Sequence, residues 1–205
     1  MAVEIVPIDI NNPNIRDLQS ALRVVREGGV IVYPTDTIYG LGANPFKKEA
    51  LEKVLHIKKA SKHKLLSLIL PDLKGISQWA NLSDGAYRLM KRVVPGPYTF
   101  ILKATKEVPK TLFQKRPTIG IRIPDAPIPL TLCRELGHPL LNTSVPLGED
   151  DYHTNPEEIA ELFAHEIDLV LHGGTLANLP SSVVDLSEDS PKILREGAGD
   201  TSLFR

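Results

Sequence analysis

The chain has 205 residues, of which 42% are apolar and 24% are charged, so its composition is that of a globular domain and excludes a disordered chain. Its one cysteine excludes an intramolecular disulfide and the common structural zinc sites, and no stretch approaches the roughly 18 apolar residues of a membrane helix. No signal peptide is visible, so we expect a cytoplasmic protein, and its net charge of −1 conceals two segments of opposite sign.

Hydrophobic spacing predicts alternating strands and helices. Short apolar or alternating runs predict strands, and apolar residues three or four apart predict amphipathic helices. In chain order these are strand 3–7, helix 15–26, strand 30–34, helix 47–59, strand 65–70, helices 73–80 and 84–92, strands 98–104 and 118–123, helix 128–136, strand 140–147, helix 156–165, and strands 167–171, 182–185 and 193–196. Residues 34–45 are predicted to form a polar loop. The interleaving favours an α/β fold with one large twisted mixed sheet.

Several helix ends carry their own signals. Ser83 and Asn155 are predicted N-caps, because their side chains accept hydrogen bonds from free backbone N–H groups. Gly28 and Gly137 follow the last apolar position of their helices, where glycine commonly ends a helix. Asn12-Pro13 is taken as the start of the first helix.

Charge is distributed unevenly along the chain. Residues 47–134 contain 18 Lys and Arg against 6 Asp and Glu, whereas residues 135–191 contain 12 acids and no Lys or Arg. The basic segment favours a polyanionic partner such as phosphates, a nucleotide or RNA. The alternative is that its lysines cover helices or pair with the acidic segment.

Polar residues gather at six places where predicted strands or helices end, and such loops are where α/β folds bind ligands. They are residues 33–42, 58–64, 118–124, 142–144, 181–185 and 195–199. Each has a structural alternative: a capped turn, a solvated helix end or a polar strand end. Arg122 lies in an apolar strand, so it needs a carboxylate or phosphate partner, and an internal acid would serve as well as a ligand.

Other sites are not supported by the sequence. There is no dinucleotide glycine pattern and no Walker phosphate loop, and the histidines lack metalloprotease spacing. Cys133 lies among apolar residues of a predicted helix, which favours a core thiol over a nucleophile. The few aromatic residues, Trp79 included, form no series typical of base stacking. We therefore expect no metal ligand, and no catalytic residue can be named.

Taken together, the motifs resemble the YrdC/YciO family, which includes the threonylcarbamoyl-adenylate synthases. YPTDTIYGLG at residues 33–42 is the most specific, and TIGIRIP, NTS, PSSVVD and ILREGAG follow in the family's order, so the resemblance covers about residues 14 to 199. It implies one YrdC-like domain over residues 1–205, an open twisted α/β sheet and a basic concave surface. It also implies conversion of L-threonine, bicarbonate and ATP into threonylcarbamoyl-adenylate and pyrophosphate for tRNA modification. Binding of double-stranded RNA is associated with the family as well.

The resemblance also implies roles for seven residues. Its substrate-binding residues would be Thr35, Tyr39, Arg122 and Ser181. Its nucleotide-binding residues would be Lys58, Ser144 and Arg195. These cations and hydroxyls, with Mg²⁺, would stabilise the charge that develops as pyrophosphate leaves.

Two positions depart from the synthase pattern. A Lys-x-Arg pair becomes Lys58-Lys59-Ala60, and a Ser-x-Asn pair becomes Ser144-Val145-Pro146, a pattern that resembles the YciO branch. One guanidinium and one amide are absent, although neighbouring lysines supply charge without a planar fork. Three hypotheses follow: an enzyme of threonylcarbamoyl-adenylate chemistry, a non-catalytic double-stranded-RNA-binding protein, and a small-molecule sensor that keeps the threonine pocket.

Overall fold

The computed structural model describes residues 3–58, 66–112, 117–147, 151–188 and 190–205. Within these residues, eleven strands form one mixed sheet, so the fold is a single-domain α/β fold with a large sheet. The strands are β1 (Glu4–Pro7), β2 (Val30–Tyr33), β3 (Gly40–Ala43), β4 (Ser67–Ile69), β5 (Ala80–Asn81), β6 (Tyr98–Ala104), β7 (Thr118–Arg122), β8 (Leu140–Ser144), β9 (Leu169–His172), β10 (Ser182–Asp185) and β11 (Lys192–Arg195). The helices are α1 (Gln19–Glu27), α2 (Lys48–Ile57), α3 (Ile76–Trp79), α4 (Asp84–Lys91), α5 (Pro127–Leu136) and α6 (Pro156–Leu162).

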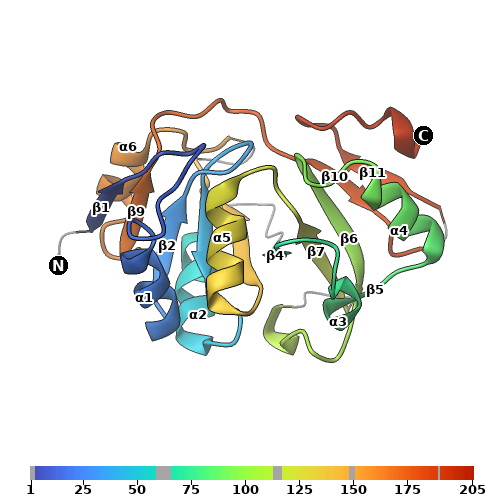
Figure 1. Cartoon of the computed structure of the whole chain (residues 1–205), viewed down its shortest axis with the longest axis horizontal. Coiled ribbons are helices and arrows are strands. Elements are labelled where there is room, and N and C mark those ends of the chain that lie inside the picture. Colours follow the sequence, from blue (N-terminus) through green and yellow to red (C-terminus); the bar gives the residue numbers. More distant parts are fainter. Residues whose placement is uncertain (1–2, 59–65, 113–116, 148–150, 189) are drawn as a thin grey trace.

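The strand order across the sheet is β1-β9-β2-β3-β8-β4-β7-β6-β10-β11, and β5 pairs with β6 outside this path. Parallel pairs (β1–β9, β2–β9, β4–β7 and β6–β10) occur beside antiparallel ones. The edge strands β1 and β11 lie at opposite ends of the molecule, as do the termini (Figure 1). Most neighbours in the sheet are therefore distant in sequence.

Two apolar cores lie against the sheet. Along β2, Ile31 and Tyr33 join the core beneath α1 and α5, whereas Val30 and Val32 join the larger core with α2. This alternation follows from the two-residue period of a strand. The larger core continues to Met90 of α4. Among the described residues, no helix is long and apolar enough to cross a membrane.

Most of the predicted elements are confirmed, including β6 and β10 over the predicted residues. Ser83 Oγ accepts from Ala86 N, and Asn155 Oδ1 accepts from Glu157 N and Glu158 N, so both predicted N-caps are present. Gly28 and Gly137 end α1 and α5 with φ of 88° and 74°.

Several predicted boundaries are wrong; β8 and α6, for example, end at Ser144 and Leu162, before the predicted residues 147 and 165. The largest differences are at three other places. The first helix begins at Gln19 instead of residue 15, because the preceding residues form i→i+3 turns in which Asp17 N donates to Asn14 O and Leu18 N to Ile15 O. The predicted helix 73–80 is reduced to α3, whose chain continues into β5. The predicted loop 34–45 contains β3, a buried strand between β2 and β8.

Candidate functional site

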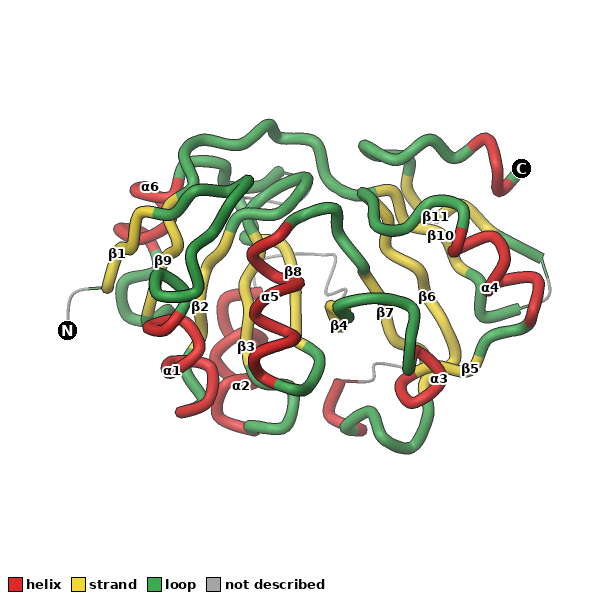
Figure 2. Tube along the Cα trace, in the orientation of Figure 1, coloured by secondary structure: helices red, strands yellow, loops and turns green. Residues whose placement is uncertain are grey.

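A cavity lies where polar residues of six neighbouring strands meet the end of α2. Its lining includes Lys58, Arg122 and Arg195. Hydroxyl and amide groups accompany them, from Ser67, Thr99, Asn142, Ser144, Tyr152 and Ser181. The segment 173–181, which ends at Ser181, connects β9 to β10 across the top of the view in Figure 2. The sheet order β8-β4-β7-β6-β10-β11 thus gathers residues that are far apart in sequence.

Arg122 is the last residue of β7, and its side chain is buried. Its Nη2 donates to Asp36 Oδ1 at 2.9 Å and to Thr37 Oγ1 at 3.2 Å. Its Nε is buried and has no hydrogen-bond partner in the described part of the chain. Burial lowers the pKa of the guanidinium and the Asp36 carboxylate opposes this shift. Arg122 therefore has an internal acid partner and still presents an unsatisfied donor.

Arg195 is the last residue of β11, and its side chain hydrogen-bonds to the segment before β10. Its Nε and Nη2 donate to Ser181 O at 3.0 and 2.8 Å, and its Nη1 donates to Tyr152 OH at 3.0 Å. The Ser181 hydroxyl lies 2.9 Å from Thr99 Oγ1 on β6. Arg195 is thus fixed by neutral oxygens, and no carboxylate of the described residues pairs with it.

Lys58 follows α2 directly and is 2% exposed. In the described residues its ammonium has no carboxylate partner. Burial and, secondarily, the charge of Arg195 lower its pKa from 10.5 to about 8. Burying a cation without a counter-ion is unfavourable, so this arrangement favours an anionic ligand.

The cavity floor is held by a hydrogen-bonded row. Tyr33 OH donates to Asn142 Oδ1 at 2.6 Å, and Asn142 Nδ2 donates to Ser67 Oγ at 3.0 Å. This row links polar side chains of β2, β8 and β4. Ser144, two residues after Asn142, lines the cavity at the end of β8. The row fixes the positions of the amide and hydroxyls before any ligand binds.

Thr35 and Tyr39 lie outside the cavity lining. Thr35 Oγ1 is 3.0 Å from Thr37 Oγ1, so it reaches Arg122 through that hydroxyl. Tyr39 OH donates to Gly174 O at 2.7 Å and accepts from Gly173 N at 3.1 Å. Tyr39 therefore holds the start of the segment that crosses toward Ser181.

The structure brings together five of the seven sequence-predicted site residues: Lys58, Arg122, Ser144, Ser181 and Arg195. It adds Asp36, Ser67, Thr99 and Tyr152, which sequence reasoning did not single out as site residues. A polar residue inside an apolar strand was an available signal for Thr99, because such a residue needs a partner. No spacing signal pointed to Tyr152. Lys59, Ala60, Lys62 and Lys64 lie outside the described residues.

The site fits anions better than a protein-held metal. No carboxylate is among the described lining residues, and no cluster of three His, Cys, Asp or Glu residues occurs in the described chain. Mg²⁺ prefers octahedral oxygen ligands that include carboxylates. The described lining residues therefore do not fit a resident Mg²⁺.

The fold and site define an α/β protein with a buried cationic pocket. A family model described as telomere recombination, for the Sua5, YciO and YrdC proteins, matches residues 23–197, so the chain belongs to this family. The uncharacterized protein YciO of Escherichia coli K12 is 44% identical over 196 residues, 95% of each chain. The crystal structure of E. coli YciO matches with a TM-score of 0.94 at 42% identity, over 99% of this chain and 100% of that one.

More distant relatives have named activities or ligands. A threonylcarbamoyl-AMP synthase of Vibrio vulnificus is 29% identical over 187 residues, 89% of this chain and 100% of its own. The structure of P. abyssi Sua5 complexed with L-threonine matches with a TM-score of 0.85 at 27% identity. That match covers 94% of this chain and 57% of Sua5. The chain is thus similar both to YciO and to the synthases.

Proposed function

We propose that the pocket binds L-threonine together with an adenine nucleotide, as ATP or as threonylcarbamoyl-adenylate. The observation that carries this proposal is the convergence of Lys58, Arg122 and Arg195 on one cavity. Among the described residues, Lys58 has no carboxylate partner and Arg122 Nε has no hydrogen-bond partner. Both a carboxylate and phosphates suit such donors. The relatives that make threonylcarbamoyl-AMP or bind L-threonine supply the identity of the ligands.

Each site residue takes a role in this proposal. Arg122 holds the threonine carboxylate or a phosphate, and Ser181 lies beside the substrate. Thr35 and Tyr39 support the threonine pocket through Thr37 and the Gly173–Gly174 backbone. Lys58, Ser144 and Arg195 contact the nucleotide.

The chemistry assigned to these groups is electrostatic. Forming the adenylate brings anions together and releases pyrophosphate, so fixed cations and hydroxyls lower the energy of the developing charge. The cavity contributes preorganised donors: Arg195 is held by Ser181 and Tyr152 before ligand binds. No described residue is required as a nucleophile.

The second departure from the synthase pattern has a structural consequence. Pro146, where the synthases carry Asn, forms an isolated bridge with Tyr152, and Tyr152 in turn contacts Arg195. A tyrosine hydroxyl therefore stands at the guanidinium that the adenylate phosphate would use. The absence of the amide at position 146 favours recognition of a finished adenylate over its rapid synthesis, since removing one preorganised donor commonly lowers a rate by about 10²–10³-fold.

Pyrophosphate release from ATP in the presence of L-threonine and bicarbonate tests the reaction, with each substrate omitted in turn. Threonine-dependent release that Lys58→Ala abolishes supports the synthase reaction. No release, beside an active synthase, rejects synthesis. Calorimetry with threonylcarbamoyl-adenylate and with ATP then tests the pocket itself. If the wild-type protein binds neither of them, the proposal is rejected.

RNA binding is the second candidate function. Exposed cations of the basic segment, among them Lys47, Lys74, Arg88 and Lys91, form no ion pair with a described residue. A duplex RNA that displaces counterions at these groups would bind less tightly as salt rises, with a steep logarithmic slope. Undetectable binding of double-stranded RNA at low salt would reject this candidate and leave the pocket proposal intact.

A further inference from the structure

A second cavity lies at the C-terminal end of α5. It has a volume of about 280 Å³ and runs between Gly137-His138-Pro139 and the segment that leads into α3. Trp79, the only tryptophan of the chain, lines it. None of the residues proposed to bind threonine or the nucleotide in the first site lines this cavity. Its size suits one planar ring, because pockets for whole drug-sized ligands occupy about 300–1,000 Å³.

Three aromatic rings from three separate segments meet beside this cavity. The Phe46 centroid lies 5.9 Å from that of Trp79 and 5.6 Å from that of His138, at interplanar angles of 47° and 86°. Phe46 is 48% exposed, and the buried Asn44 orients it by accepting a hydrogen bond from its backbone N–H. An exposed ring that is held in place leaves a face available for stacking.

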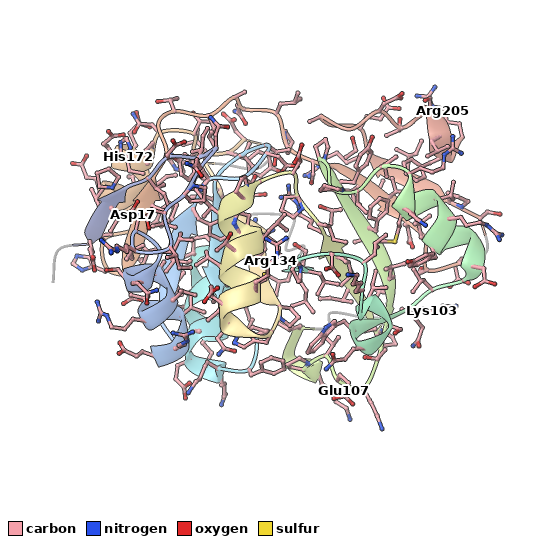
Figure 3. The ribbon with its side chains drawn as sticks, viewed as in Figure 1. Asp17, Lys103, Glu107, Arg134, His172 and Arg205 are labelled. Carbon is pink, nitrogen blue, oxygen red and sulfur yellow. The ribbon has the colours of Figure 1, made fainter. Side chains whose placement is uncertain are left out.

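The rim of this cavity is cationic. Lys74 and Arg134 line it, both are exposed, and neither forms an ion pair with a described carboxylate. Arg134 projects from α5 on the side of α3 (Figure 3). No Asp or Glu is among the described lining residues, so the surface complements an anion.

We propose that this groove binds an unpaired nucleotide of an RNA strand. The base stacks on Trp79 and Phe46, and the flanking phosphates contact Lys74 and Arg134. Aromatic faces with adjacent cations are the means by which proteins hold single-stranded nucleic acid. A duplex keeps its bases paired and cannot offer such a face.

A strand fits the groove better than a free nucleotide. The described lining presents no buried charged side chain that would fix a single phosphate. Its two cations, Lys74 and Arg134, stand on the rim. Several phosphates of one strand can use this spread, whereas a mononucleotide uses one of them. The inference deepens the RNA-binding candidate and is independent of the adenylate pocket.

The single tryptophan provides the measurement. Trp79 fluorescence is followed while a single-stranded oligoadenylate, a hairpin duplex of the same length, or AMP is added. We expect the single strand to quench Trp79, and Phe46→Ala to weaken its binding by about 5- to 100-fold through loss of stacking. Lys74→Ala and Arg134→Ala weaken binding and reduce its salt dependence.

Matched variants separate the groove from general charge. Lys192→Ala removes an exposed lysine on β11, outside the groove, and Lys58→Ala alters only the first pocket, so both should bind the strand as wild type does. Phe46→Ala must retain the wild-type melting temperature. Trp79→Phe keeps an aromatic face and should retain most of the affinity, as measured with a labelled strand.

The outcomes distinguish the groove from the broader RNA candidate. Equal binding of duplex and single strand without quenching overturns the groove and leaves RNA binding standing. If AMP quenches Trp79 with the same apparent Kd as the single strand, the occupant is a free nucleotide and not a strand. Unchanged affinity of Phe46→Ala overturns the stacking contact. None of these results bears on the first pocket, which the pyrophosphate-release assay tests separately.

Discussion

Lys58 shows how one residue can be prepared for a ligand by the fold. The last turn of α2 is a favourable place for a cation because of the helix dipole. Here, however, the side chain is buried beside Arg195 and its pKa is lowered to about 8. At neutral pH most of the population still carries the proton. An incoming phosphate would supply the missing counter-charge and raise this pKa again.

The affinity of an anionic ligand should therefore depend on pH around the pKa of Lys58. Below about 8 the ammonium is already protonated, and above it binding must take up a proton, so affinity falls as pH rises. Calorimetry with threonylcarbamoyl-adenylate on both sides of this pH measures the decline and the proton uptake. Lys58→Ala should weaken binding by about 10- to 100-fold, the effect of losing one hydrogen bond to a charged group.

Lys58→Arg is the matched control for this titration, because its guanidinium stays protonated throughout. We expect its affinity to be flat across the same pH range, apart from any ionisation of the ligand itself, which the two proteins share. Identical pH profiles for Lys58→Arg and wild type would assign the titration to another group.

At the scale of elements, β3 depends on two glycines that allow Tyr33 to lie across them. A Cβ at Gly42 would stand 2.5 Å from Tyr33 Cε1, and one at Gly40 would stand 2.6 Å from Asn142 Oδ1. The Tyr33 ring thus occupies the space that side chains would fill. This packing orients the Tyr33 hydroxyl toward Asn142 at the cavity floor.

Gly42→Ala should consequently destabilise the protein by about 1–3 kcal/mol, the usual effect of overpacking a core. Gly85→Ala is the matched control, because Gly85 lies in α4 and the added Cβ would be 3.7 Å from Ser83 Oγ, which is an ordinary van der Waals contact. We expect it to be neutral or to stabilise by up to about 1 kcal/mol. Denaturant unfolding measures both, and equal midpoints would contradict the role of Gly42.

The same strand explains where sequence reasoning succeeded and failed. Periodicity located the central part of nearly every element, because helix and strand spacing depend on local burial alone. Glycine is poor in strands, so residues 40–43 were predicted as loop; the contact with Tyr33 and pairing to two strands overrode that preference. The start of α1 was misplaced because apolar spacing does not distinguish a helix from the i→i+3 turns before it.

For the site, the sequence predicted residue types better than partners. Arg122 was expected to need an anion, but only the fold brings Asp36 to 2.9 Å from it. Tyr152 and Arg195 are likewise 43 residues apart and meet because β10 and β11 place Arg195 beside the cavity. The aromatic group of Phe46, Trp79 and His138 joins three segments, so no one-dimensional series could reveal it.

At the scale of the whole molecule, the candidate pocket brings together elements that are far apart in sequence. Arg195 and Ser181 come from the β10–β11 end of the sheet, Lys58 from the end of α2, and Asn142 from β8. In the ligand-free protein, Lys58 and Arg195 repel each other across the cavity. A bound polyanion would replace this repulsion with attraction and connect these parts.

Ligand should therefore stabilise the protein as a unit. At a ligand concentration about 100-fold above Kd, linkage adds about 2.7 kcal/mol, which corresponds to a rise in Tm of roughly 5–10 °C for a chain of this length. Hydrogen exchange should show added protection at the end of α2 and in β10 and β11 together. Lys58→Met removes a buried cation that has no carboxylate partner among the described residues, so it should keep or raise Tm without ligand and lose most of the rise with ligand. Protection confined to one of these segments, or an undiminished rise in Lys58→Met, would mean that the ligand does not bridge the pocket.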